Sequence, residues 1–128
     1  MKLAAFTAAT LTALSLLAPS ARAAPARQCF FIRQVDNFSV TDDEQTVYLR
    51  VNGTRFFRLD LAQQCTGLSF LDHIALKSFG GVSSVCDAID IDLRVSQAPG
   101  GGAMPCQAAA LHAMTSEEVA ALPKKLKP

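Results

Sequence analysis

The dipeptide Asn52-Gly53 constrains the fold more than any other feature of the chain, because it is a strong signal for a tight β-hairpin. It stands between two runs rich in β-branched and aromatic residues, Thr46–Val51 and Thr54–Leu59. A type I′ turn needs a positive φ at both central residues, which asparagine tolerates and glycine adopts without steric cost. The sequence therefore predicts a central hairpin that turns at these two residues.

A two-residue turn fixes the predicted register of this hairpin. It places Arg50 opposite Arg55 and Leu49 opposite Phe56. Side chains alternate along a strand, so both faces of the hairpin are largely apolar near its middle. In a sheet with one solvent-exposed face, apolar and polar residues would alternate more regularly along each strand. We therefore expect an all-β or β-rich α+β domain, a small antiparallel barrel or sandwich built on this hairpin.

Two arginines directly across a hairpin repel each other by a few tenths of a kcal/mol or more. Converging guanidinium groups would suit a carboxylate or phosphate ligand. The alternative is that each arginine turns to solvent or meets a nearby aspartate. Tyr48, Arg50 and Arg55 are accordingly the candidate binding residues on the sheet.

The N-terminal stretch 1–23 has the form of a secretory signal peptide. Lys2 precedes a run of small and apolar residues, which ends at Pro19 and an Ala-Arg-Ala cleavage box at 21–23. The apolar run is short for a membrane span, and no stop-transfer segment follows it. We expect an exported chain that begins near Ala24 and has no membrane span after cleavage.

Residues 24–128 have the length of a single domain. Removal of Lys2 and Arg22 lowers the formal net charge from +1 to −1. A nearly neutral chain offers no electrostatic basis for binding nucleic acid.

The four cysteines, Cys29, Cys65, Cys86 and Cys106, all follow the cleavage box. An even number of cysteines in a small exported domain indicates disulfides. Four cysteines permit three connectivities, and sequence alone does not choose among them. The pairing we favour is Cys65–Cys86 with Cys29–Cys106, the second joining regions near the two ends of a compact domain.

The rest of the chain predicts further strands, loops and one helix. In the first half we expect a bent first strand over Cys29–Val40, a polar turn at Thr41–Glu44, and a turn after Leu68 followed by a strand over His73–Lys77. A loop at Gly80-Gly81, an alternating strand over Ala88–Val95 and a flexible loop over Gln97–Pro105 are expected next. The chain is expected to end with a strand or helix start over Gln107–Ala113, a short helix capped by Thr115 with Glu118, and a frayed tail over Lys124–Pro128.

Asp87, Asp90 and Asp92 form the candidate metal site if the chain has one. Alternation would place Asp90 and Asp92 on one strand face, with Asp87 just before it, where three carboxylates suit a hard cation such as calcium. The alternative is a solvated strand face that pairs with Arg94, and we expect no metal and no cofactor. A small carboxylate-dependent hydrolase would have to use Asp87, Asp90 and His73.

Several features of the chain together resemble a domain-of-unknown-function family of small exported bacterial proteins with paired cysteines. They are Cys29 at the start of the first strand, the segment FRLDLAQQC that ends at Cys65, the pair Cys86-Asp87, and the closing TSEEVAAL. The resemblance implies a location in the bacterial envelope or periplasm. It carries over no catalytic residue.

We therefore expect a periplasmic or secreted, non-catalytic domain that binds another envelope protein or a small ligand, or contributes structurally. It is expected to be a monomer. The loops at Gly80 and before Cys106 are candidate recognition surfaces, because loops on a rigid scaffold often carry binding residues. The alternative is the small hydrolase or a metal-binding protein.

Overall fold

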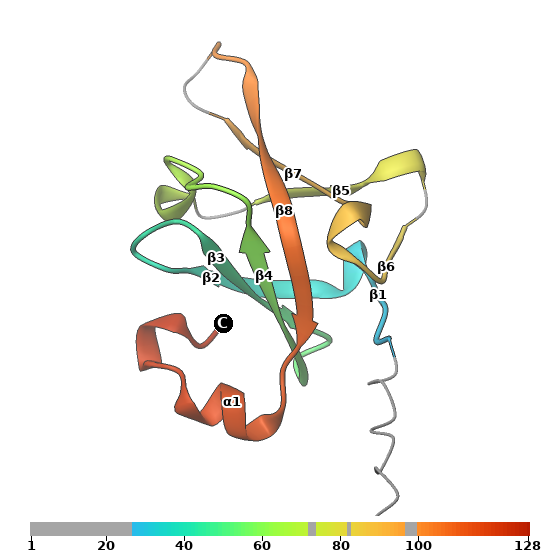
Figure 1. Cartoon of the computed structure of the whole chain (residues 1–128), viewed down its shortest axis with the longest axis vertical. Helices are drawn as coiled ribbons and strands as arrows, with labels where there is room; N and C mark the ends of the chain where they lie inside the picture. The colour runs from blue at the N-terminus through green and yellow to red at the C-terminus, as the bar shows by residue number, and fades with distance from the viewer. Residues whose placement is uncertain (1–26, 72–73, 82, 97–99) are drawn as a thin grey trace, which may run out of the picture.

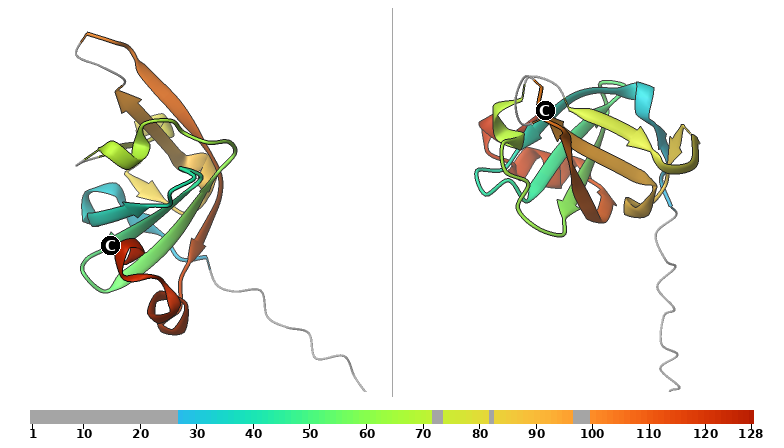
Figure 2. Two further views of the ribbon diagram at one scale, coloured as in Figure 1. Left: turned by 90° about the vertical axis from the view of Figure 1, so that its left-hand side faces the viewer. Right: turned by 90° about the horizontal axis from the view of Figure 1, so that it is seen from above.

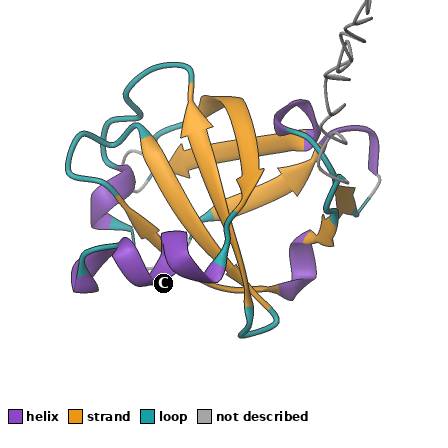
Figure 3. Cartoon of the chain, turned by 60° about the horizontal axis from the view of Figure 1, so that its bottom comes forward, coloured by secondary structure: helices purple, strands orange, loops and turns teal. Residues whose placement is uncertain are grey.

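The computed structural model describes residues 27–71, 74–81, 83–96 and 100–128, which form a β-rich fold. Six strands make one antiparallel sheet in the order β2-β3-β4-β8-β7-β5, and β1 pairs with β6 in a separate ribbon. The large sheet curls into a half-barrel (Figure 1, Figure 3). The strands are β1 (Phe30–Phe31), β2 (Val35–Val40), β3 (Thr46–Val51), β4 (Arg55–Leu61), β5 (Ala75–Ser78), β6 (Ser84–Val85), β7 (Ile91–Ser96) and β8 (Ala103–Ala113), and the α-helix is α1 (Ser116–Ala121).

Short 3₁₀ turns connect several of these strands. They are η1 (Ile32–Gln34), η2 (Leu68–Phe70), η3 (Phe79–Gly81), η4 (Ala88–Asp90) and η5 (Lys124–Leu126). The predicted fold class, a β-rich domain with a small antiparallel barrel or sandwich built on a central hairpin, a short C-terminal helix and disulfides, is confirmed, and the observed form is a curled half-barrel.

The core fills the concave side of the half-barrel. It consists mainly of alternating residues of three strands, Val47, Leu49 and Val51 of β3, Phe57, Leu59 and Leu61 of β4, and Ile91, Leu93 and Val95 of β7. Burial of each such side chain stabilises the fold by about 1.5–3 kcal/mol. These three strands are therefore the main source of the sheet's stability.

The central hairpin turns at the predicted residues, but its loop is longer than predicted and its register differs. Asn52 and Gly53 have φ values of 52° and 70°, yet Thr54 is an additional loop residue and Val51 pairs with Arg55. The predicted pairing of Arg50 with Arg55 is therefore wrong, and Arg50 pairs with Phe56 instead. A three-residue loop shifts the partner strand by one position, which exchanges its two faces.

The apolar pattern of β4 explains this shift. In the observed register the core face carries Phe57, Leu59 and Leu61. The predicted register would have turned Arg58 and Asp60 towards the core instead. Burial of unpaired charges costs far more than one extra loop residue, so the hydrophobic alternation overrides the two-residue turn.

The first predicted strand is divided into two. β1 pairs with β6, η1 follows, and β2 then begins at Val35. The expected bend is present, since the pairing of β2 with β3 is irregular between Val35 and Asn37. Phe30 of β1 packs on Phe57, with ring centroids 4.6 Å apart. The β1–β6 ribbon therefore contributes directly to the core.

The alternating strand expected over Ala88–Val95 begins three residues late. Its first residues form the turn η4, because the Asp87 and Asp90 side chains accept backbone N–H groups at the start of the turn. Ile89 was predicted to point to the core, but it is 79% exposed. Asp90 and Asp92 therefore do not share a strand face.

Strand β8 is longer than the sequence predicts. Gln107–Ala113 is strand, and the strand extends back through the Ala103–Pro105 part of the expected loop, pairing with β7. Residues 97–99 of the expected loop lie outside the described residues. The strand expected over His73–Lys77 is observed as β5, after the turn η2; His73 itself also lies outside the described part of the chain.

The C-terminal helix has the predicted cap. The Thr115 hydroxyl accepts the Glu118 N–H at 3.2 Å, and the Glu118 carboxylate accepts the Thr115 N–H at 2.7 Å. The capping box and the proline at position 123 explain where the helix begins and ends.

The tail after this helix is ordered against the sheet, so the expectation of a frayed end is wrong. The Ser39 hydroxyl donates to the Leu126 carbonyl at 2.6 Å, and Arg50 donates to the Pro128 carbonyl at 3.3 Å. The Pro128 side chain is buried. The segment thus lies against the convex side of β2 and β3, opposite the core (Figure 1, Figure 2).

The disulfides are Cys29–Cys86 and Cys65–Cys106, so the pairing that we favoured is wrong. The register of the paired strands explains which cysteines are bonded. Phe30 is opposite Val85, which brings Cys29 beside Cys86. Leu61 is opposite Ala108, which brings the segment after β4 to Cys106. Proximity of the chain ends is a weaker constraint than strand register.

A buried carboxylate, Glu44, orders the loop after β4. Its Oε1 atom accepts hydrogen bonds from the Ser69 hydroxyl at 2.7 Å and from the Ser69 and Gly67 N–H groups at 3.0 Å each. These bonds, led by the Ser69 hydroxyl, hold the pKa of Glu44 below its ordinary value of 4.5. Its own carbonyl accepts the Cys65 N–H at 3.0 Å. Glu44 therefore positions the segment that carries one disulfide.

Tryptic digestion without reductant will distinguish all three disulfide pairings, because each cysteine falls in a separate peptide. We expect the peptide 28–33 to be linked to 78–94, and 59–77 to be linked to 95–124. Mass spectrometry of the digest measures the linked masses. A mass for 59–77 joined to 78–94 would contradict the structure.

Substitution Glu44→Gln should lower the free energy of unfolding by about 2 kcal/mol near neutral pH, because it removes charge-assisted hydrogen bonds to a buried group. The lowered pKa of Glu44 means that its contribution is fully present above 4.5 and is lost as the pH falls through the folded-state pKa. Urea unfolding of both proteins at several pH values should therefore show a difference that shrinks in acid. The exposed Glu117→Gln is the matched control, and an equal effect in that variant would contradict the assigned role.

Candidate binding cleft beside strand β8

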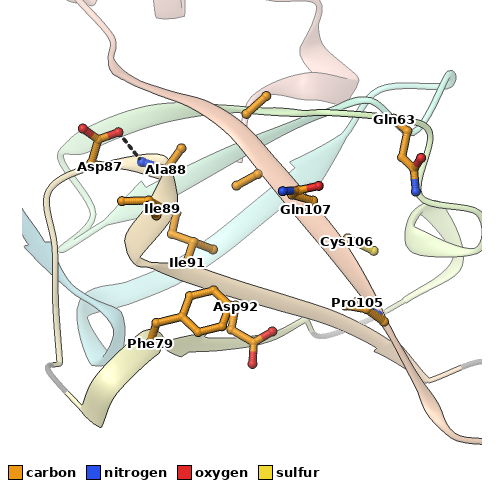
Figure 4. Close-up of a pocket in the computed structure, with 12 residues that line it drawn as sticks. Gln63, Phe79, Asp87, Ala88, Ile89, Ile91, Asp92, Pro105, Cys106 and Gln107 are labelled. Carbon is orange, nitrogen blue, oxygen red and sulfur yellow. Dashed lines mark hydrogen bonds between the residues drawn. The ribbon is translucent and has the colours of Figure 1, made fainter.

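A cleft of about 610 Å³ lies between β8, the start of β7 and the turns η3 and η4 (Figure 4). Its floor is formed by side chains that are almost fully buried, among them Ile91, Ala88 and Cys106. The lining residues are Gln63, Phe79, Asp87, Ala88, Ile89, Ile91, Asp92, Pro105, Cys106, Gln107, Ala108 and Ala109. The cleft is thus built mainly on two adjacent strands of the rigid sheet.

Two large apolar side chains line this cleft while remaining open to solvent. Phe79 is 58% exposed and Ile89 is 79% exposed. They come from different turns, η3 and η4, and contribute to the same cleft (Figure 4). A single exposed apolar residue is ordinary, but a group that lines one depression is typical of an interaction site.

Local hydrogen bonds fix the position of Ile89. Asp87 Oδ1 accepts the Ala88 N–H at 2.7 Å, and Asp90 Oδ2 accepts the N–H groups of Cys86 and Asp87 at 2.9 Å each. Both ends of the turn are therefore tied by carboxylates. Cys86 is also bonded to Cys29. The turn presents Ile89 on a support that is held by hydrogen bonds and a disulfide.

The polar side chains of the cleft have different environments. Asp92 pairs with Arg94 at 3.0 Å, and its side chain is 14% exposed. Asp87 is exposed, and it forms no ion pair with another of the described residues. Gln63 and Gln107 add amide groups at the opposite side of the cleft (Figure 4). The cleft thus combines an apolar wall with one exposed carboxylate and neutral hydrogen-bonding groups.

A second cleft, of about 400 Å³, continues along β8 towards α1. It is lined by Arg27, Gln28, Phe57, Cys86, Asp87, Leu111, His112, Ala113 and Thr115. Asp87 lines both clefts. The two depressions therefore meet at the start of η4 and follow one strand.

The three sheet residues predicted to bind a ligand do not converge. Tyr48 is 9% exposed. Arg50 lies on the convex side and pairs with Asp36 at 2.6 Å. Arg55 lies on the same face of β4 as Phe57. It donates to the Cys29 carbonyl at 2.9 Å, and its guanidinium lies 5.1 Å from the Phe57 ring centroid. The arrangement does not form the predicted anion site.

The aspartates of the alternative metal and hydrolase sites also have different structural roles and do not act as one group. Asp90 caps η4 and Asp92 pairs with Arg94. In the part of the chain that the structure describes, no group of three histidine, cysteine or acidic residues is placed to hold a metal ion. All four cysteines are in disulfides. His73, the proposed partner of Asp87 in a hydrolase, is outside the described residues.

Sequence reasoning identified part of this site but missed its apolar wall. The loop at Gly80 was a predicted recognition surface, and Phe79 precedes it directly. Ile89 was assigned to the core because it continues the alternation of β7. The spacing Asp87-x-x-Asp90 was the available signal, since two short acidic side chains three residues apart favour a capped turn over a strand.

Comparison with known proteins gives one match. A family model described as a family of unknown function (DUF6491) matches residues 1–127. Neither the curated proteins nor the solved structures contain a match to the chain. Among the described residues, no helix is both long enough and apolar enough to cross a membrane. Because the match extends over nearly the whole sequence, the chain belongs to the DUF6491 family of unknown function.

Proposed function

We propose that the chain is an exported, non-catalytic binding module, and that it binds another protein of the bacterial envelope through the cleft beside β8. The observation that carries this proposal is the placement of Phe79 and Ile89 on one cleft while both remain exposed. Water contact at such side chains is unfavourable, and a partner that covers them would gain the hydrophobic free energy of their burial.

The disulfides support a location in an oxidising compartment. All four cysteines are paired, whereas reducing agents in the cytoplasm keep most thiols free. The signal-peptide pattern of residues 1–23 supports export to the periplasm or beyond. The two observations are independent, since one concerns the folded domain and the other the segment before it.

The form of the cleft favours a protein over a small molecule as the ligand. Small-molecule sites bury most of their ligand among enclosing side chains. Here the two largest apolar lining residues remain more than half exposed. A protein surface or segment can cover such residues without being enclosed by them, as at the apolar centre of an interface with a polar rim.

Export can be tested by expression of the full chain in a Gram-negative host, followed by fractionation and intact-mass measurement. We expect the protein in the periplasmic fraction, with a mass that corresponds to residues 24–128 and four oxidised cysteines. The control is a chain without residues 2–23, which should remain in the cytoplasm with reduced thiols. Full-length protein in the cytoplasm would contradict the proposed location.

Binding can be tested in intact cells of the native host with a photo-crosslinking amino acid at single exposed positions. A crosslinker that replaces Ile89 should give a discrete adduct with another protein, because position 89 borders the cleft. The matched control is position 70, since Phe70 is 88% exposed and does not line this cleft. Equal adducts at both positions, or none at position 89, would contradict the proposed binding face.

A further inference from the structure

Strand β8 has an edge that its neighbours leave open. β7 pairs with Ala103–Gln107, whereas β4 pairs with Ala108–Ala113 on the other side. Among the strands that the structure describes, none pairs with the second edge of Ala108–Ala113. This edge is about 20 Å long at the usual rise per residue, long enough for one added strand.

The hydrogen-bond pattern shows which backbone groups this edge presents. The Met114 N–H donates to the Phe56 carbonyl of β4 at 2.8 Å. Backbone groups alternate in direction along a strand, so the N–H groups of Leu111 and Ala113 point away from β4, towards the open edge. These donors are the ones that an added strand would use.

The last part of the edge, Ala110–Ala113, lacks several of the features that normally prevent strand addition. Exposed edges are usually protected by lysine, proline, a bulge or a covering segment. The segment from Ala108 to Ala113 reads AAALHA and contains neither lysine nor proline. Its irregularity lies at Ala109, where the pairing with β4 shifts. Beyond that point Ala110–Ala113 pairs regularly with β4, and the residues at its two ends are alanines.

The edge is recessed. The two clefts of about 610 and 400 Å³ run along β8, and Asp87 of the opposite wall lines both. Ile89 and Phe79 stand on the far side of the larger cleft (Figure 4). Because the edge is reached through these two clefts, we take the occupant to be a single extended segment and not the broad edge of a second copy's sheet.

Building on the proposed function, we propose that an extended segment of the partner protein adds to β8 as a strand beside Leu111–Ala113, with an apolar side chain against Phe79 and Ile89 and a basic side chain beside Asp87. Backbone hydrogen bonds provide affinity in this mode, and the alternate side chains provide specificity. The charge of the segment follows from the exposed Asp87 carboxylate. Arg27 and His112 line the other cleft, so the basic side chain belongs at the Phe79 end of the segment.

The probe for this proposal is a phage-displayed library of random linear octapeptides, selected on the oxidised protein. A parallel selection uses the double variant Phe79→Ser/Ile89→Ser. We expect the wild-type protein to enrich peptides that alternate apolar residues and contain a lysine or arginine. The absence of any sequence enriched over the double variant would overturn the proposal.

A synthetic copy of an enriched peptide then locates the binding mode. Its binding should slow hydrogen exchange of the Leu111 and Ala113 amides, measured by NMR on the ¹⁵N-labelled protein. Ala113→Pro removes one outward N–H without removing a β4 hydrogen bond, and should weaken binding about tenfold or more. Binding with unchanged exchange at both amides would overturn strand addition.

Exposed-residue variants keep the test decisive even if Ala113→Pro fails to fold. Ile89→Ser should weaken peptide binding about tenfold, whereas Phe70→Ser, which removes a comparably exposed apolar side chain elsewhere, should not. Equal effects in these two variants would overturn the assigned contact. A crosslink at position 89 without protection of the β8 amides would leave the proposed function standing and remove strand addition alone.

Discussion

Burial of the alternating apolar side chains of β3 and β4 sets the register on which the rest of the half-barrel depends. Their pairing puts Leu49 opposite Phe57, so both side chains enter the core. The same register turns Arg55 towards the β1–β6 ribbon and Arg50 towards the C-terminal tail. One choice of register therefore decides where both ends of the domain attach.

Short acidic side chains are the second determinant of the local backbone structure. They accept backbone N–H groups within a few residues and so replace strand by turn where the apolar pattern alone predicts strand. Asp87 and Asp90 do this before β7. Glu44 acts differently, because it orders a segment far from it in the sequence, the loop near Cys65. The cleft owes its apolar wall to the first of these cases, since a continued strand would have turned Ile89 inward.

The sequence predicted what depends on neighbouring residues and missed what depends on distant ones. The Asn52-Gly53 turn, the alternation that begins at Ile91 and the capping box at Thr115 involve residues a few positions apart, and all are observed. The hairpin register and the disulfide pairing required knowledge of which faces and strands meet, and both predictions failed.

The candidate site was predictable to a similar degree. A loop at Gly80 was expected to take part in recognition, but its partner in the cleft, Ile89, is distinguished from a core residue only by the hydrogen bonds of Asp87 and Asp90. Glu44 offered no signal at all, because an acidic residue in a polar turn is usually solvated. Its burial is decided by a loop that follows more than twenty residues later in the chain.

The two disulfides interlace along the chain, since Cys65 lies between Cys29 and its partner Cys86. A chain that crosses a membrane with its N-terminus first would present Cys29 and then Cys65 to the oxidant, before either native partner emerges. Rapid oxidation in order of arrival would join these two and block both native bonds. In such a chain, formation of the native protein depends on delayed oxidation or on thiol–disulfide exchange by an isomerase.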